Sequence, residues 1–95
     1  MSEIVDKAVA ILNAKLGGQG FDGSAKFVFE GEGTLILDAD GARAGDEETD
    51  VTLTATAEVF QAILSGDQNP TSAFMSGRLA IDGSMGQAMK LAAIL

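Results

Sequence analysis

The amino-acid sequence predicts one α+β domain over residues 1–95, with helices packed on one face of an antiparallel sheet. Segments that alternate with the two-residue period of strands are joined by glycine-containing turns, and strands joined in this way run antiparallel. Segments with helical spacing lie at both ends of the chain and between strands. The predicted order is helix, three or four strands, two helices, strand and helix, which is typical of this fold class. A chain of 95 residues that is 46% hydrophobic can form a single core.

The first predicted element is an amphipathic helix over residues 3–16. Ser2 is its expected N-cap, and acidic residues in the first turn favour the helix dipole. The glycines at 17–18 end it. Its apolar residues recur at helical spacing along one side: Ile4, Ala8, Ile11, Leu12 and Leu16.

Two strands are predicted next, over residues 24–30 and 34–38. Asp40-Gly41 is a strong hairpin signal, and a short third strand over residues 42–45 follows it in one interpretation. Alternation places one set of large apolar side chains toward the core: Phe27, Phe29, Leu35 and Leu37.

The acidic run over residues 46–50 predicts a solvated loop, with recruitment of a basic partner as the alternative. After it the alternation is regular. Val51, Leu53 and Ala55 point one way and three threonines point the other, which predicts a half-buried strand over residues 51–56.

The remaining elements carry clear start and stop signals. Thr56 caps a predicted helix over residues 57–65, whose apolar face includes Phe60 and Ile63, and Asn69-Pro70 begins a short helix. That helix carries Phe74 and Met75 and stops at Gly77. A brief strand follows over residues 78–82, with Leu79 and Ile81 on one face. A last helix from about Ser84 has an apolar stripe: Met85, Ala88, Met89, Ala92 and Leu95.

Composition excludes several classes of function. Fourteen acidic and six basic residues give a net charge of −8, so nucleic acid is not an expected partner and contact with anionic membranes is at most transient. The chain has no histidine and no cysteine, so we expect no catalytic residues, no metal site and no cofactor. No apolar stretch approaches the roughly 20 residues of a membrane span, and the N-terminus has no basic signal-peptide region, which favours a cytoplasmic protein.

Residues 69–91 read NPTSAFMSGRLAIDGSMGQAMKL. This block resembles the C-terminal signature of the sterol carrier protein-2 domain, with its Asn-Pro, Ala-Phe-Met, Gly-Arg-Leu and Ile-x-Gly groups and a Met-Lys-Leu helix. The resemblance implies a five-stranded, mainly antiparallel sheet with helices covering one face. It also implies an apolar tunnel between sheet and helices that holds a lipid. Because the third strand is short and the sequence ends soon after Leu91, a small pocket or one open at that end is an alternative to the tunnel.

Apolar character and this resemblance together indicate the candidate ligand contacts. The methionines and phenylalanines can form an adaptable pocket wall, and ordinary core packing is the alternative interpretation. Phe27 and Phe29 are expected to serve the core first and the pocket second. Arg78 or Lys90 could meet a lipid carboxylate, although solvent-exposed charge is the favoured interpretation. The full set of predicted ligand contacts is Phe27, Phe29, Leu35, Leu53, Phe60, Ile63, Phe74, Met75, Met85 and Met89.

The predicted function is non-catalytic binding or transfer of an apolar lipid: a fatty acid, acyl chain, sterol-like molecule or isoprenoid. The alternative is an accessory module that presents lipid to a partner enzyme, because similar domains occur appended to enzymes or as helpers in isoprenoid-quinone biosynthesis.

Overall fold

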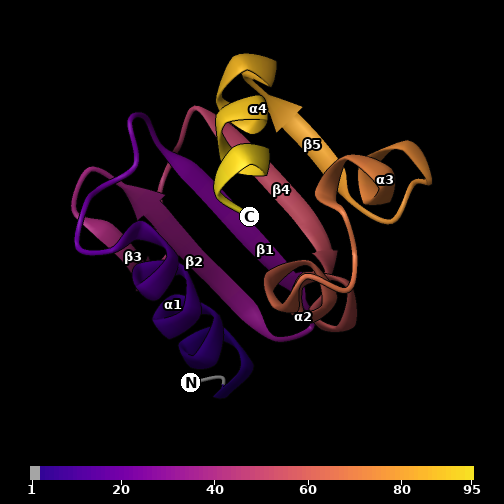
Figure 1. Cartoon of the computed structure of the whole chain (residues 1–95), viewed down its shortest axis with the longest axis horizontal. Coiled ribbons are helices and arrows are strands. Elements are labelled where there is room, and N and C mark those ends of the chain that lie inside the picture. Colours follow the sequence, from indigo (N-terminus) through magenta and orange to yellow (C-terminus); the bar gives the residue numbers. More distant parts are fainter. Residues whose placement is uncertain (1–2) are drawn as a thin grey trace.

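A computed structural model describes residues 3–95 of the chain (Figure 1). The predicted order of elements is confirmed throughout this range. Ser2, the expected cap of the first helix, lies outside the described residues. The elements are α1 (Glu3–Leu16), β1 (Ala25–Glu30), β2 (Gly33–Asp38), β3 (Gly41–Ala44), β4 (Val51–Thr56), α2 (Ala57–Ser65), α3 (Pro70–Met75), β5 (Ala80–Gly83) and α4 (Met85–Ile94).

The fifth strand begins two residues later than the sequence predicts. The backbone N–H groups of Arg78 and Leu79 both donate to the carbonyl oxygen of Ala73, at 2.9 and 3.1 Å. These bonds extend the turn that ends α3, so the two residues are not available to pair with a neighbouring strand. Ala80 is therefore the first residue of β5, which pairs with Thr54 of β4.

The five strands form one mixed, mainly antiparallel sheet in the order β3-β2-β1-β4-β5. Three neighbouring pairs are antiparallel, and β1 and β4 pair in parallel at the centre, with Ala25 opposite Val51. Because β3 is an edge strand and β4 is central, the connection between them must pass across the sheet. The α+β class with a five-stranded, mainly antiparallel sheet is thus confirmed.

The helices cover one face of this sheet. Helix α1 packs on β2 and β3, α2 lies against β1 and β4, and α4 packs on β4 and β5 (Figure 1). Between them lies the core, in which Phe60 of α2 contacts two rings of β1. The centroid of its ring is 5.5 Å from that of Phe27 and 4.4 Å from that of Phe29. None of the helices described within residues 3–95 is long and apolar enough to cross a membrane.

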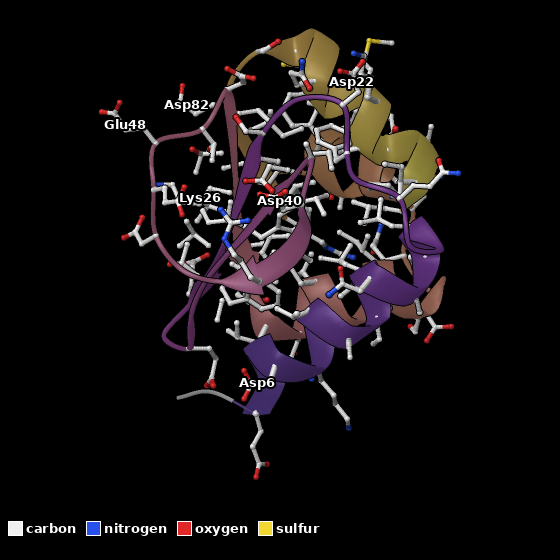
Figure 2. All side chains as sticks on the ribbon, turned by 90° about the vertical axis from the view of Figure 1, so that its left-hand side faces the viewer. Asp6, Asp22, Lys26, Asp40, Glu48 and Asp82 are labelled. Atoms are coloured by element: carbon white, nitrogen blue, oxygen red, sulfur yellow. The ribbon has the colours of Figure 1, made fainter. Side chains whose placement is uncertain are left out.

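The acidic connection over residues 45–50 lies on the other face of the sheet, away from the helices (Figure 2). It is largely exposed, and it also has structural contacts that the sequence did not indicate. Lys26 Nζ of β1 forms an ion pair with Asp46 Oδ1 at 2.9 Å. Arg43 Nη2 of β3 forms another with Glu47 Oε2 at 3.1 Å. Ile36, on the outer side of β2, is only 1% exposed beneath this connection.

Arg43 also binds Asp38, the last residue of β2, at the turn of the β2–β3 hairpin. Its guanidinium donates two hydrogen bonds of 2.9 Å, one to each carboxylate oxygen of Asp38. These hydrogen bonds, with one from the backbone N–H of Asp40, hold the pKa of Asp38 below its usual value. A carboxylate with a lowered pKa stabilises the fold above its unfolded-state pKa, and that stabilisation is lost as the pH falls through the lowered value.

At Gly83, the last residue of β5, the neighbouring backbone of the sheet leaves no room for a side chain. Its φ angle is +106°, and a Cβ atom there would meet the carbonyl oxygen of Asp50 and come within 3.1 Å of Val51 Cα. We expect Gly83→Ala to lower the free energy of unfolding by roughly 2–3 kcal/mol, because strain and a backbone collision combine. Urea unfolding would measure it.

Gly77→Ala is the matched control for this substitution. Gly77 has a φ angle of +81°, but a Cβ atom there would meet nothing within 4 Å. The control should therefore show only the left-handed backbone cost of about 1 kcal/mol. Equal losses in the two variants would contradict the proposed collision with the Asp50 carbonyl.

Candidate functional site

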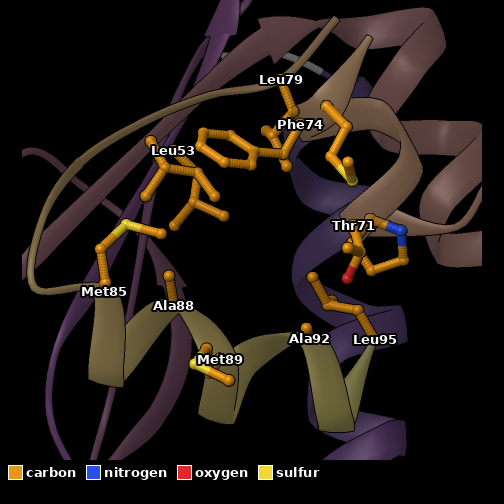
Figure 3. A pocket seen from close by; sticks show the side chains of 12 residues that line it. Leu53, Thr71, Phe74, Leu79, Met85, Ala88, Met89, Ala92 and Leu95 are labelled. Carbon is orange, nitrogen blue, oxygen red and sulfur yellow. The ribbon is translucent and has the colours of Figure 1, made fainter. Parts of the chain in front are cut away.

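An apolar pocket of about 290 Å³ lies between helices α3 and α4, above strands β4 and β5 (Figure 3). Twelve residues line it, and all but one have apolar side chains: Leu53, Pro70, Thr71, Phe74, Met75, Leu79, Ile81, Met85, Ala88, Met89, Ala92 and Leu95. A concave surface of this composition is typical of a site for an apolar molecule.

Helix α3 supplies one wall of the pocket because its start is fixed by a cap. The side-chain oxygen of Asn69 accepts the N–H groups of Thr71 and Ser72, at 2.8 and 3.1 Å. Thr71, Phe74 and Met75 then follow at i, i+3 and i+4, which places them on one side of the helix. That side faces α4 across the pocket (Figure 3).

Helix α4 supplies the opposite wall by the same geometry. Ser84 caps it by accepting the N–H of Gln87 at 3.3 Å. The predicted stripe that begins at Met85 faces the pocket, and Leu91, on a neighbouring side of the helix, is fully buried and anchors α4 to the core. The sequence identified this stripe as apolar, and the structure places it in the pocket wall.

Strands β4 and β5 form the floor of the pocket. Leu53 of β4 lies directly opposite Ile81 of β5 in the register of the sheet, and Leu79 precedes that strand. Leu53 and Leu79 are each 2% exposed, because they also pack into the hydrophobic core. The floor is therefore fixed by the sheet, whereas the two walls are short helices.

The walls leave much apolar surface uncovered by protein. Met75 is 80% exposed, Met89 72%, Met85 49% and Phe74 38%. An exposed cluster of large apolar side chains on a domain of this size indicates a binding surface. The pocket is partly open to solvent, so within residues 3–95 the structure has a pocket and does not show the closed tunnel that the resemblance implied.

The structure divides the ten predicted ligand contacts into two groups of five. One group lines the pocket: Leu53, Phe74, Met75, Met85 and Met89. The other group lies in the core, at 1% exposure or less, and does not line it: Phe27, Phe29, Leu35, Phe60 and Ile63. Ligand contact by the first group stays a prediction.

Sequence reasoning did not assign the other lining residues to a ligand site. Leu79, Ile81, Ala88, Ala92 and Leu95 were recognised only as apolar faces of their elements. The helical spacing of the α4 stripe was the signal that could have placed three of them beside Met85 and Met89. Pro70 and Thr71 were missed because the sequence indicated them only as the start of a helix.

Among residues 3–95, no charged side chain lines the pocket. Lys90 Nζ lies 3.2 Å from a carboxylate oxygen of Asp22, and Arg78 Nη1 donates to Gln68 Oε1 at 3.2 Å. The hydroxyl of Thr71 is the one polar side-chain group among the lining residues. In the described part of the chain no three acidic side chains gather into a group that could hold a metal ion. The arrangement can bind an apolar molecule, and its lining offers no acid–base pair.

Known proteins are similar to this chain in sequence and in fold. The profile of the SCP-2 sterol transfer family matches residues 2–95. Human sterol carrier protein 2 is 38% identical over an alignment of 65 positions, and this alignment covers 63% of this chain and 12% of the human protein. The sterol carrier protein domain 2 of Helicoverpa armigera has a TM-score of 0.77 and 32% identity, over 96% of this chain and 84% of that one.

A third similar protein was solved with a ligand. It is the sterol carrier protein-2 of Aedes aegypti in complex with the C16 fatty acid palmitate, at a TM-score of 0.77 and 19% identity, over 98% of this chain and 94% of that one. At this identity the likeness concerns the fold. The comparisons thus agree with the α+β architecture and with a sheet of this topology.

Proposed function

The chain belongs to the SCP-2 sterol transfer family, and from this premise we propose that it binds one apolar lipid chain in the pocket between α3 and α4, without catalysing a reaction. The observation that carries the proposal is the pocket itself, with eleven apolar side chains among its twelve lining residues. Burial of an acyl chain against such a surface is favourable by about 0.8 kcal/mol per methylene group.

The size of the pocket supports a slender ligand. Its volume of about 290 Å³ lies just below the usual range of ligand pockets, about 300–1,000 Å³. Three flexible methionine side chains can adjust the walls to a longer chain. The palmitate complex of the Aedes aegypti protein, which has a similar fold, supports a fatty acyl chain as one form of the ligand.

The role of the bound lipid has two candidates. Transfer between membranes would involve only transient contact, because a net charge of −8 is repelled by anionic bilayers. Presentation of the lipid to a partner enzyme is favoured by one observation: the matched region is only 12% of the human relative, so the domain there is joined to a much longer chain. A cytoplasmic location stays a prediction.

The two roles differ in what the isolated chain can do. Native mass spectrometry of gently purified protein would give the mass and stoichiometry of the bound lipid. If the isolated chain moves a fluorescent acyl lipid between neutral vesicles, transfer is supported. If it binds the lipid but moves none, and a co-purifying enzyme accelerates its release, presentation is supported.

Filling the pocket should weaken lipid binding without unfolding the chain. Ala92 lines the pocket, so Ala92→Phe projects a ring into the space between α3 and α4 (Figure 3). We expect affinity for a fluorescent C16 acyl probe to fall at least about tenfold, because the ring occupies volume that the acyl chain needs. Fluorescence titration would measure it, with circular dichroism as the check on folding.

Ala93→Phe is the matched control on the same helix. Ala93 is exposed and does not line the pocket, so the same added volume there should leave affinity unchanged. Equal affinity of the two folded variants for the probe would show that the lipid binds elsewhere.

A further inference from the structure

The six basic side chains of the chain all lie outside the pocket lining. Two are on α1, which packs over β2 and β3, toward the opposite edge of the sheet from the pocket. Lys26 and Arg43 are held by acids of the outer face and the β2–β3 edge. Arg78 and Lys90 neighbour lining residues in sequence, but they bond Gln68 and Asp22 instead.

Several backbone donors at the two helix starts beside the pocket are also engaged. The N–H groups of Thr71 and Ser72, at the start of α3, donate to the side chain of Asn69. At the start of α4, the N–H of Gln87 donates to Ser84. The start of α3 therefore offers no free backbone donor to a carboxylate or phosphate, and at α4 the N–H of Gln87 is already bonded.

The remaining polar group is the Thr71 hydroxyl at the exposed rim of α3. A hydroxyl can donate or accept one hydrogen bond with a neutral alcohol or carbonyl. It cannot compensate the charge of a carboxylate, and moving an unpaired carboxylate out of water is strongly unfavourable. The net charge of −8 adds repulsion of any anion.

We propose that the pocket selects lipids with an uncharged head group, such as a long-chain alcohol or ester, over the fatty-acid anion of the same chain length. This inference rests on the proposed function and names the class of ligand for the same pocket. A fatty-acid anion binds only with its carboxylate left in water beyond the rim. An alcohol of equal length enters further and bonds Thr71.

The test compares three probes of equal chain length: 1-hexadecanol, methyl palmitate and palmitate. Each is delivered from cyclodextrin to the full chain at a pH where palmitate is ionised, and displacement of a fluorescent acyl probe gives its affinity. At low ionic strength we expect both neutral probes to bind about tenfold or more tightly than palmitate.

Ionic strength separates repulsion from ion pairing. Raising salt from about 0.01 M to about 1 M shortens the screening length from about 30 Å to about 3 Å. We expect palmitate affinity to rise relative to hexadecanol as repulsion is screened. Palmitate binding as tightly as the neutral probes, with an affinity that falls with salt, would overturn the inference. Failure of all three probes to bind would instead contradict the proposed function.

Three substitutions locate the effect. Thr71→Val removes the hydroxyl at nearly constant volume and should weaken hexadecanol about threefold to tenfold while leaving palmitate unchanged. Arg78→Ala and Lys90→Ala should change neither affinity, because their side chains bond other residues. A selective loss of palmitate affinity in either basic-residue variant would overturn the inference.

Discussion

Truncation of Phe60 to alanine is expected to lower the free energy of unfolding by about 3–5 kcal/mol. The ring is 1% exposed, and its centroid lies 5.5 Å from that of Phe27 and 4.4 Å from that of Phe29. It joins α2 to the central strand β1, so its loss leaves a cavity between two layers. Small domains have total stabilities of about 5–15 kcal/mol, so urea unfolding should show a large shift of the midpoint.

Phe74→Ala is the matched control, because it removes the same ring from the pocket wall. Phe74 is 38% exposed, so it contributes less buried surface to the fold. We expect the two variants to differ in what they lose. Phe60→Ala should lose mainly stability, whereas Phe74→Ala should lose affinity for the acyl probe with a smaller loss of stability. A mild effect of Phe60→Ala, below about 1 kcal/mol, would show that the aromatic cluster is not closely packed.

Peroxide treatment is expected to lower lipid affinity at least about tenfold. Met75, Met85 and Met89 all line the pocket and are exposed, and the chain has no cysteine, tryptophan, tyrosine or histidine to compete for the oxidant. Hydrogen peroxide transfers one oxygen to each thioether sulfur, and water leaves. Each sulfoxide is polar and must stay hydrated, so the walls no longer offer a continuous apolar surface to the acyl chain.

A variant with leucine at all three positions is the control. Leucine keeps the walls apolar at similar volume, so Met75→Leu, Met85→Leu, Met89→Leu should bind the acyl probe and keep its affinity after peroxide treatment. Met1 is oxidised in both proteins and cancels in the comparison. If the variant loses as much affinity as the natural chain, oxidation of the pocket methionines is not the cause.

Local signals predicted most of the fold. The caps at Thr56, Asn69 and Ser84 are confirmed, because each depends on contacts within three residues. The parallel pairing of β1 with β4 could not be read from alternation, since a strand's pattern shows which side faces the core and not which strand lies beside it. The contacts of the acidic connection depend on that same long-range arrangement.

The pocket was predicted less completely than the fold, for a physical reason. Apolar character alone does not separate a side chain that packs against protein from one that awaits a ligand. Leu91 and Met89 lie two residues apart on α4, yet Leu91 is fully buried and Met89 is 72% exposed. Only the relative placement of α3, α4 and the sheet distinguishes them, and that placement is a tertiary property. Thr71 is polar and stands at a helix start, so no apolar pattern in the sequence indicates it.

The parallel pair at the centre of the sheet has a consequence for the order of folding. Strands β1, β2 and β3 pair with their neighbours in sequence, so this meander can form early, whereas β4 must close a long loop to reach β1. The other three elements of the pocket, α3, β5 and α4, follow β4 in the chain. During synthesis we expect β1 to present an unpaired edge beside Phe27 and Phe29 until residues 51–56 emerge, so a nascent chain stalled before Val51 should aggregate more readily than the full chain.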